Sequence, residues 1–416
     1  MTKKHRHCLV VIGLLICIAV ASPALARQRI SFAGFFSNWV EGGFQQALDN
    51  FSKAHDVDVE VVDSTSWQDL WQKVLVMSAG GIQLDVLYGD NTTVMYFARE
   101  GLSQPIDQIA GKDIKLDLFP RSVLSVLEID GQLYGIPTAL SLHNLYYNID
   151  LFAQAGLNRL PTDWESERLD WDEYVSMVRK LTVDTDGDGQ PNRFGTQTLG
   201  FGSIGFNMVG MWGLHLFNPA GDEWYGDTPD AIAALERNAT LRTELNAVGG
   251  SITAGTAAIF PVQSYYLNTL AGVTSINWSV GPMPKGTQRS SQAGFHGISI
   301  AKDTKDLDLA WKLVKYLTYD PEGVVLFTRA ENRVPVHPQA GRDFVERWSK
   351  VLTADEAWCI VGGVGYAYES RMTRPTRQLD IRKIMEDGGR RVWNGTASVR
   401  QMMSEISPQI RALMEP

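Results

Sequence analysis

The chain has 416 residues, of which 44% are hydrophobic and 20% are charged, and its formal net charge is −9. This acidic balance argues against nucleic acid and anionic membrane surfaces as partners, because both carry negative charge and attract basic proteins. The length exceeds what one hydrophobic core usually supports, so it predicts two domains.

The first 26 residues read as a secretory signal peptide. Three basic residues precede an apolar run over 9–21, and Ala24-Leu25-Ala26 supplies the small residues of a cleavage site. The run is too short for a bilayer, which takes about 20 apolar residues. A lipid anchor at Cys17 is disfavoured because the bulky Ile16 precedes it. We therefore expect export to the periplasm, with cleavage after Ala26.

Cleavage at this site changes both the charge and the cysteine content. It removes three of the 38 basic residues and no acidic residue, so 35 basic residues face 47 acidic ones and the net charge becomes −12. It also removes two of the three cysteines, which leaves Cys359 with no partner for a disulfide within the chain.

Strands and helices are predicted to alternate in the first part of the mature chain. Alternating apolar residues predict strands, and apolar residues at helical spacing predict helices. The expected strands cover 29–34, 57–61 and 84–88, and the expected helices lie around 44–51, 70–79 and 92–99. Such alternation implies right-handed crossovers and a parallel sheet, in which ligands bind at the carboxyl ends of the strands.

The stretch 135–152 is predicted to be a hinge. A strand is expected to end at Pro137, because proline cannot donate to the interior of a sheet, and a second extended run covers 144–148. Asp150 is expected to cap the helix that begins at Leu151. A strand that pauses and resumes can belong to two sheets and can therefore join two lobes.

The remaining elements follow from the same patterns. Helices are expected over 171–181, 230–245, from 264, over 309–317 and through most of the tail from 342; extended stretches are expected over 256–262, 276–283 and 298–300. Pro282 and Pro284 mark the expected return crossing between the lobes.

An acid-rich loop between the predicted helices matches the start of a calcium-binding loop. Its candidate ligands are Asp184, Asp186, Asp188, Gln190 and Asn192. Position 12 of the loop is Gly195 instead of the usual Glu, so a solvated turn is favoured and calcium is the alternative.

Several motifs, in a common order over nearly the whole mature chain, resemble the extracellular solute-binding proteins of ABC importers. The resemblance is to the carbohydrate-type family that includes maltose- and glycerol-phosphate-binding proteins. The motifs are LDVLYGDN at 84–91, REGL at 99–102, DGQLYGIP at 130–137, YYNIDLF at 146–152, VGPMP at 280–284 and AWKLV at 310–314.

This resemblance implies an α/β, two-lobed periplasmic-binding-protein fold of the class II type, with the ligand cleft between the lobes. It places the N-terminal lobe at 27–137 plus 283–335 and the C-terminal lobe at 138–282 plus 336–416. A sugar needs aromatic rings for its C–H faces and polar groups for its hydroxyls. The candidate ligand-binding residues are Phe36, Ser37, Asn38, Trp39, Ser64, Tyr88, Asp90, Asn91, Ser141, His143, Phe206, Asn207, Trp212, Tyr265, His296 and Arg371.

Several of these candidates also have a structural interpretation. Trp39 could be a core contact of the following helix, and Trp67 is interpreted as a core residue at the start of a helix. Either Asp90 or Asn91 is expected to cap the next helix, which leaves the other for the ligand. Arg371, like Arg374, could bind an anionic ligand or pair with Glu369.

Two functions are consistent with these patterns. The favoured one is a monomeric, non-catalytic periplasmic protein that needs no cofactor, captures a sugar, polyol or sugar derivative by lobe closure, and delivers it to the permease of an ABC importer. A neutral sugar is favoured, and Arg371 and Arg374 keep an anionic sugar open. The alternative is an exported glycan hydrolase, which needs two carboxylates beside the glycosidic bond. Asp90 is the only carboxylate among the candidate residues of the cleft.

Overall fold

The structure is a computed structural model that describes residues 27–36, 39, 43–198, 205–371 and 377–415. Within these ranges the chain forms a mixed α/β architecture with an eleven-stranded sheet whose main order is β2-β1-β3-β11-β7-β9-β8. Three residues considered above, Ser37, Asn38 and Arg374, lie outside the described residues. Among the helices that are described, none has the length and apolar character needed to cross a membrane.

The first part of the described chain confirms the predicted strand–helix alternation. Its strands β1 (Gln28–Gly34), β2 (Val57–Asp63) and β3 (Val86–Asp90) pair in parallel in the order β2-β1-β3. The helices between and after them are α1 (Phe44–His55), α2 (Trp67–Ala79) and α3 (Asn91–Arg99). The carboxyl ends of β2 and β3 therefore lead into the first turns of α2 and α3.

The predicted break at Pro137 is wrong, because one strand, β7 (Ile136–Asn148), runs through the proline and is buried along its whole length. Pro137 pairs with Gly297 of β11 (Ser291–Ala301), and the register of this pairing shifts between Phe295 and Gly297. A proline removes one hydrogen bond from the ladder, and an irregularity in the partner strand tolerates that loss.

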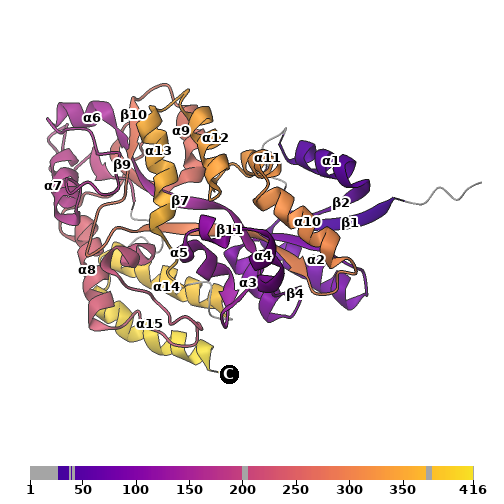
Figure 1. Cartoon of the computed structure of the whole chain (residues 1–416). Helices are drawn as coiled ribbons and strands as arrows, with labels where there is room; N and C mark the ends of the chain where they lie inside the picture. Colours follow the sequence, from indigo (N-terminus) through magenta and orange to yellow (C-terminus); the bar gives the residue numbers. More distant parts are fainter. Residues whose placement is uncertain (1–26, 37–38, 40–42, 199–204, 372–376, 416) are drawn as a thin grey trace, which may run out of the picture.

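Strand β7 pairs with different partners along its length. Its first half pairs with β11 and with β12 (Val334–Pro335), whereas its second half pairs with β9 (Ala257–Gln263) and β10 (Trp278–Gly281). Figure 1 shows β7 and β11 between the group α1, α2, α10 and α11 and the group α6, α7 and α8. Residues 282–290 connect β10 to β11. The predicted lobe boundaries stay a prediction.

Asp150 does not cap the helix after β7. Helix α6 (Ile149–Gln154) begins two residues earlier than predicted, and the Asn148 side chain accepts hydrogen bonds from the backbone N–H groups of Asp150 and Leu151, at 2.9 and 3.1 Å. Asp150 instead accepts from the side-chain amide of Asn277 at 3.0 Å. An Asn at the end of the strand reaches the same orphan N–H groups that an Asp would satisfy.

The other elements complete the two ends of the sheet. The longer helices are α7 (Trp171–Leu181), α8 (Pro229–Thr243), α10 (Leu307–Thr318), α11 (Pro321–Glu331), α12 (Pro338–Trp348), α13 (Ala354–Gly362), α14 (Gln378–Trp393) and α15 (Val399–Met414). The shorter elements include β4 (Ser103–Gln104), α4 (Asp107–Asp113), α5 (Arg121–Leu124), β5 (Glu128–Ile129), β6 (Gln132–Leu133), β8 (Phe194–Thr196), α9 (Leu267–Ala271), β13 (Ala367–Tyr368) and the 3₁₀ helices η4 (Phe206–Trp212) and η5 (Ser264–Tyr266). Helices α14 and α15 pack on each other and on α8 (Figure 1).

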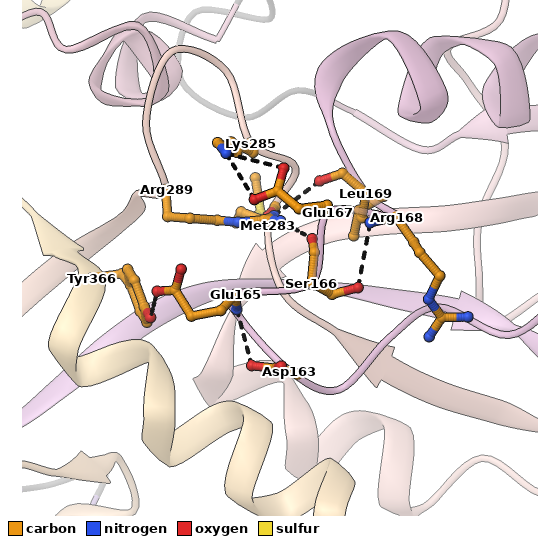
Figure 2. Close-up of polar contacts among 10 residues, drawn as sticks. All are labelled: Asp163, Glu165, Ser166, Glu167, Arg168, Leu169, Met283, Lys285, Arg289 and Tyr366. Carbon is orange, nitrogen blue, oxygen red and sulfur yellow. Dashed lines mark hydrogen bonds and ion pairs between the residues drawn. The ribbon is translucent and has the colours of Figure 1, made fainter.

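The loop between β10 and β11 is held by polar contacts with a neighbouring loop (Figure 2). Arg289 donates from Nη1 to the carbonyl oxygen of Leu169 at 2.9 Å and from Nη2 to that of Ser166. Lys285 Nζ lies 3.0 Å from Glu167 Oε1. These contacts anchor the chain immediately before β11, the strand that carries several residues of the candidate site.

Candidate functional site

A cavity of about 660 Å³ lies where β3, β7, β9 and β11 meet. This volume is typical of small-ligand pockets, which span roughly 300 to 1,000 Å³. The structure brings together seven of the predicted site residues on its wall: Asp90, Asn91, Ser141, His143, Asn207, Tyr265 and His296. Sequence reasoning missed other lining residues, which include Trp67, Phe260, Gln263, Arg333 and Glu369.

Strand pairing explains why four of these residues meet. Asp90, the last residue of β3, pairs with His296 of β11. His296 lies at the register shift between β11 and β7, where an irregular strand can re-aim a side chain. Ser141 and His143 are two residues apart on β7, so they face the same side of the sheet.

His296 is held from beneath the cavity by a buried tyrosine. Its Nδ1 lies 3.2 Å from the hydroxyl oxygen of Tyr88, which donates to Glu331 Oε1 at 2.8 Å. Burial, and then the nearby charge of Arg333, hold the pKa of His296 well below its usual value. His296 is therefore a neutral imidazole.

His143 is held by a backbone carbonyl. Its Nδ1 lies 2.9 Å from the carbonyl oxygen of Gln292, and its Nε2 lies 3.5 Å from Asn207 Nδ2. A carbonyl can only accept, so Nδ1 carries the proton and Nε2 accepts from Asn207. Burial lowers the pKa of His143 to about 4, although the bond to Gln292 raises it. Asn207 Oδ1 is buried with no hydrogen-bond partner.

Asp90 caps α3, as one of the two sequence alternatives proposed. Its Oδ1 accepts from the backbone N–H of Thr93 at 2.8 Å and from the Thr93 hydroxyl at 2.6 Å. Burial raises the pKa of Asp90. The side-chain oxygen of Asn91 accepts from the backbone N–H of Phe295 at 3.4 Å, so this residue also has a structural contact while it lines the cavity.

A buried carboxyl and an arginine lie behind the Asp90 wall. Glu331 Oε1 accepts from the hydroxyls of Tyr88 and Thr138, whereas Oε2 is buried without a partner. Burial raises the pKa of Glu331 to about 7, although Arg333 and the two hydroxyls lower it. Arg333 lines the cavity and donates from Nη1 to the carbonyl oxygen of Glu331 at 3.0 Å, while its Nε is buried without a partner.

Aromatic rings from two sides line the cavity. Trp67, the first residue of α2, is half-buried, and its ring centroid lies 5.2 Å from Phe35 and 6.0 Å from His296. Its interpretation as a core residue is therefore incomplete, since it lies at the wall as well as against the core. Tyr265, in η5, is 54% exposed and supplies a ring from the other side.

Comparison with known proteins identifies the family. Residues 46–357, about three quarters of the chain, match the family model described as bacterial extracellular solute-binding protein. This chain belongs to that family. Its members are binding proteins as a class, not enzymes.

Individual relatives agree with this assignment. A protein of Brucella abortus (strain 2308), named only as a binding protein, is 22% identical over 351 residues, which cover 79% of this chain and 81% of the relative. A maltodextrin-binding protein of Bacillus subtilis (strain 168) is 22% identical over 369 residues and covers 82% of each chain. The crystal structure of a sugar transporter from Rhizobium etli in an open conformation has a TM-score of 0.77 at 16% identity, covering 92% of this chain and 99% of that one. The predicted α/β periplasmic-binding-protein fold is confirmed by this likeness.

Three predicted contacts on the first side of this solute-binding protein lie in the core instead. Phe36, Trp39 and Tyr88 form one aromatic cluster: the ring of Trp39 lies 5.0 Å from each of the other two rings, and 4.9 Å from Phe327. Tyr88 is fully buried. Large rings gain more from this packing than from exposure in a loop, so the alternative core interpretation of Trp39 is the correct one. Ser64 is also buried and does not line the cavity.

Two predicted contacts on the second side have a structural role. Phe206 is fully buried in the cluster that joins η4 to α14 and α15. The ring of Trp212 lies 5.7 Å from Trp171 in an edge-on arrangement, and the guanidinium of Arg237 lies 4.6 Å above it. Neither residue lines the cavity, because η4 turns their rings toward its own supporting helices while Asn207 faces the ligand space.

Arg371 lies apart from the other candidates. It lines a second cavity of about 740 Å³, together with Arg99, His215 and Glu369, and its Nη1 donates to the carbonyl oxygen of Phe217 at 3.2 Å. Glu369 lines both cavities. The predicted anion contact of Arg371 is therefore not part of the cavity that holds His143 and His296.

The structure does not decide between a solvated turn and a calcium site for the acid-rich loop. Carboxylate oxygens of Asp184, Asp186 and Asp188 lie within 4.8 Å of one another and are exposed. Asp184 accepts backbone N–H bonds from Gly187 and Gly189, at 2.7 and 2.8 Å, and these bonds lower its pKa. The remaining candidate ligands, Gln190 and Asn192, belong to the same turn, in which Asn192 Oδ1 accepts from the backbone of Thr185. A solvated turn stays the favoured prediction for this loop, and calcium binding stays its alternative.

Proposed function

We propose that this solute-binding protein captures a neutral sugar or polyol in the 660 Å³ cavity and delivers it to the permease of an ABC importer. The observation that carries the proposal is a cavity wall that combines polar side chains, among them Asp90, Ser141 and His296, with the rings of Trp67 and Tyr265. Rings of this kind cover the C–H faces of a sugar, and acceptors receive its hydroxyl protons. The names of the Bacillus and Rhizobium relatives point to the same class of ligand.

The charges of the cavity favour a neutral ligand over an anionic one. Arg333 and Arg382 are positive groups at the wall, and the carboxylates of Asp90 and Glu369 balance them at the same wall. A bound phosphate or sulfonate would face these two acids with two arginines, one of which, Arg382, is paired with Glu386 at 2.9 Å.

Lobe closure supplies the mechanism of capture. The cavity draws Trp67, Asp90 and His296 from one side and Asn207 and Tyr265 from the other, so a ligand that contacts both sides favours their approach. Strands β7 and β11 join the two sides and support hinge movement. We take 27–137 plus 283–335 and 138–282 plus 336–416 as the two moving lobes.

The proposal includes the cellular setting. The protein is exported, its first 26 residues are removed after Ala26, and the mature chain acts in the periplasm as a monomer without a cofactor. It is not a hydrolase: among the described residues, the carboxylates at this cavity are those of Asp90 and Glu369, and Asp90 is engaged in capping α3. A pair of carboxylates free to serve as acid and nucleophile is what hydrolysis requires.

A ligand screen tests the proposal. The mature protein is heated with maltose, maltotetraose, lactose and sugar phosphates in turn, and hits are measured by calorimetry. We expect a neutral saccharide to raise the melting temperature and to be recovered intact. Preferential stabilisation by sugar phosphates would refute the neutral-ligand proposal, and release of cleaved saccharide would restore the hydrolase.

A further inference from the structure

We propose that Glu331 and Tyr88 act as positioning residues that fix the tautomer of His296, so that its Nε2 presents a lone pair to a ligand hydroxyl. The inference deepens the proposed function, on which the role in ligand binding rests. The tautomer itself is a property of the free protein and can be measured without any ligand.

The Tyr88 hydroxyl has a single proton, so it can donate to only one of its two neighbours. Tyr88 Oη lies 2.8 Å from Glu331 Oε1 and 3.2 Å from His296 Nδ1. Above its pKa of about 7 the Glu331 carboxylate is ionised and can only accept a hydrogen bond, and bonds to an ionised acceptor are the stronger ones. The hydroxyl proton therefore points to Glu331. Thr138 donates to the same carboxylate oxygen at 3.0 Å, which holds the carboxylate in place.

The direction of this proton determines which ring nitrogen of His296 is protonated. With its proton directed to Glu331, Tyr88 can only accept from His296, so Nδ1 must carry the imidazole proton. His296 is 5% exposed, and burial together with Arg333 keeps it neutral. A neutral imidazole has one N–H, which leaves Nε2 as an acceptor. Nδ1 faces Tyr88, which is not on the cavity wall, so Nε2 is the nitrogen on the cavity side.

We call the chain of contacts from Glu331 through Tyr88 to His296 the relay. The groups around it agree with this assignment. Asp90 is opposite His296 in the strand pairing, and Arg333 lies at the same wall. The Asp90 carboxylate accepts hydrogen bonds from the backbone N–H and the hydroxyl of Thr93, and these hold it away from the imidazole proton. The relay therefore runs through Tyr88 alone, from a carboxylate on α11 to an imidazole on β11.

The relay has a consequence for the ligand. With a lone pair at Nε2, the wall accepts a hydrogen bond beside His296. A ligand hydroxyl can donate a hydrogen bond to this lone pair. An ether oxygen or a carboxylate at the same place has no proton to donate, and its lone pairs repel that of the acceptor. The relay thus selects a hydroxyl at the position next to His296.

Nitrogen NMR of the mature protein, labelled with ¹⁵N at histidine and free of ligand, tests the relay at pH 8.5. Two-bond ¹H–¹⁵N correlations distinguish a protonated from an unprotonated ring nitrogen. Loss of signals in His296→Gln assigns the residue. We expect His296 to be protonated at Nδ1 and unprotonated at Nε2. Protonation at Nε2 in the wild type would overturn the proposal.

Two variants extend the test. Glu331→Leu removes the acceptor, so the Tyr88 hydroxyl is free to donate to Nδ1, and we expect the proton of His296 to move to Nε2. Tyr88→Phe removes the link and should give a mixture of tautomers. Tyr146→Phe is the matched control, because Tyr146 is a fully buried tyrosine whose hydroxyl has no partner. An unchanged His296 spectrum in both Glu331→Leu and Tyr88→Phe would overturn the relay.

Calorimetry with maltotetraose and with lactose supplies the binding readout. At pH 8.5, for whichever saccharide binds the wild type, Glu331→Leu should weaken affinity about tenfold because the imidazole proton moves to Nε2, Tyr88→Phe should weaken it about twofold because a mixture remains, and Tyr146→Phe should leave it unchanged. A tenfold loss corresponds to about 1.4 kcal/mol. Failure of both saccharides to bind the wild type would count against the proposed function, while the NMR result would still decide the relay.

Discussion

The two histidines of the cavity invite comparison, because they have the same chemistry and different supports. His143 and His296 are both at least nine-tenths buried, both line the cavity, and burial lowers the pKa of both. His143 donates to the backbone carbonyl of Gln292, which cannot ionise. His296 depends on Tyr88 and Glu331, and the second of these can.

The difference teaches that one side of the cavity is fixed by the fold and the other by a side-chain network. A backbone carbonyl keeps its place for as long as β7 and β11 pair. A carboxyl and a hydroxyl keep theirs only while the protonation state and the side chains are intact. Perturbations of the Glu331 network should therefore change the His296 side and leave the His143 side in place.

The largest expected effect is on stability and its dependence on pH. Burial raises the pKa of Glu331 to about 7, so between pH 4.5 and pH 7 the folded state holds a proton that the unfolded state has lost. The contribution of Glu331 to stability is therefore largest at low pH and falls as the pH rises through this window. Relative to Glu331→Gln, which does not titrate, the wild type should lose about 3 kcal/mol of unfolding free energy between pH 5 and pH 8.5.

Urea unfolding at the two pH values measures this loss. His143→Gln serves as the comparison from the other side, because the pKa of His143 lies near 4 and the imidazole remains neutral throughout the window. The unfolded imidazole, whose pKa is about 6.5, instead binds a proton at pH 5, so relative to His143→Gln the wild type should gain about 2 kcal/mol between pH 5 and pH 8.5, opposite in sign to the Glu331 effect. Wild type and Glu331→Gln curves that run parallel would show that Glu331 does not titrate in this range.

The second effect concerns the aromatic ring beside His296. Trp67→Ala removes a half-buried ring that contacts both the imidazole and the ligand space, and truncation of such a central aromatic costs about 2 kcal/mol. We expect ligand affinity in calorimetry to fall about thirtyfold. Trp358→Ala is the matched control, since Trp358 is 46% exposed on α13 and does not line the cavity. Equal losses in the two variants would remove Trp67 from the site.

Much of the fold could be predicted because its patterns are local. The strands β1, β2 and β3 alternate in hydrophobicity, and the helices after them begin at recognisable caps such as Ser66 and Asp90. The error at Pro137 arose because the compensating irregularity lies on β11, about 160 residues away in the sequence, and no local pattern reveals it. The C-terminal tail could not be assigned to a lobe from its own residues, because its apolar stripes could pack against any exposed apolar helix face.

The site was predictable where a side chain is tied to a strand end or a strand face. Asp90 follows β3, and Ser141 and His143 alternate along β7, so their positions follow from the sheet. The positions of aromatic rings could not be predicted in this way. Trp39 packs into the core whereas Trp67 lines the cavity, although each follows a strand. Arg333 is a single arginine after α11, and only tertiary structure shows that it joins the cavity.

The third effect sharpens the comparison from the His143 side. Asn207→Ala removes a polar side chain of the cavity wall and the donor to His143 Nε2, and loss of such a hydrogen bond costs about 1 kcal/mol. We expect a roughly fivefold loss of affinity, with the NMR signals of His143 still showing a proton on Nδ1. Asn144→Ala is the control, because Asn144 is fully buried on β7 but does not line the cavity. A change in the His143 tautomer would contradict the idea that the backbone alone fixes it.

The smallest effect belongs to Tyr265, the ring on the opposite side from Trp67. More than half of its surface is exposed, so it loses less contact on truncation than a half-buried tryptophan. Tyr265→Ala should weaken binding by about 0.5 kcal/mol, close to a twofold change, whereas Tyr265→Phe should be neutral because a ring contact needs no hydroxyl. Calorimetry of both variants with the ligand used for Trp67→Ala gives the comparison. A loss as large as that of Trp67→Ala would mean that closure covers Tyr265 as completely as the fold covers Trp67, and the two sides would then contribute equally.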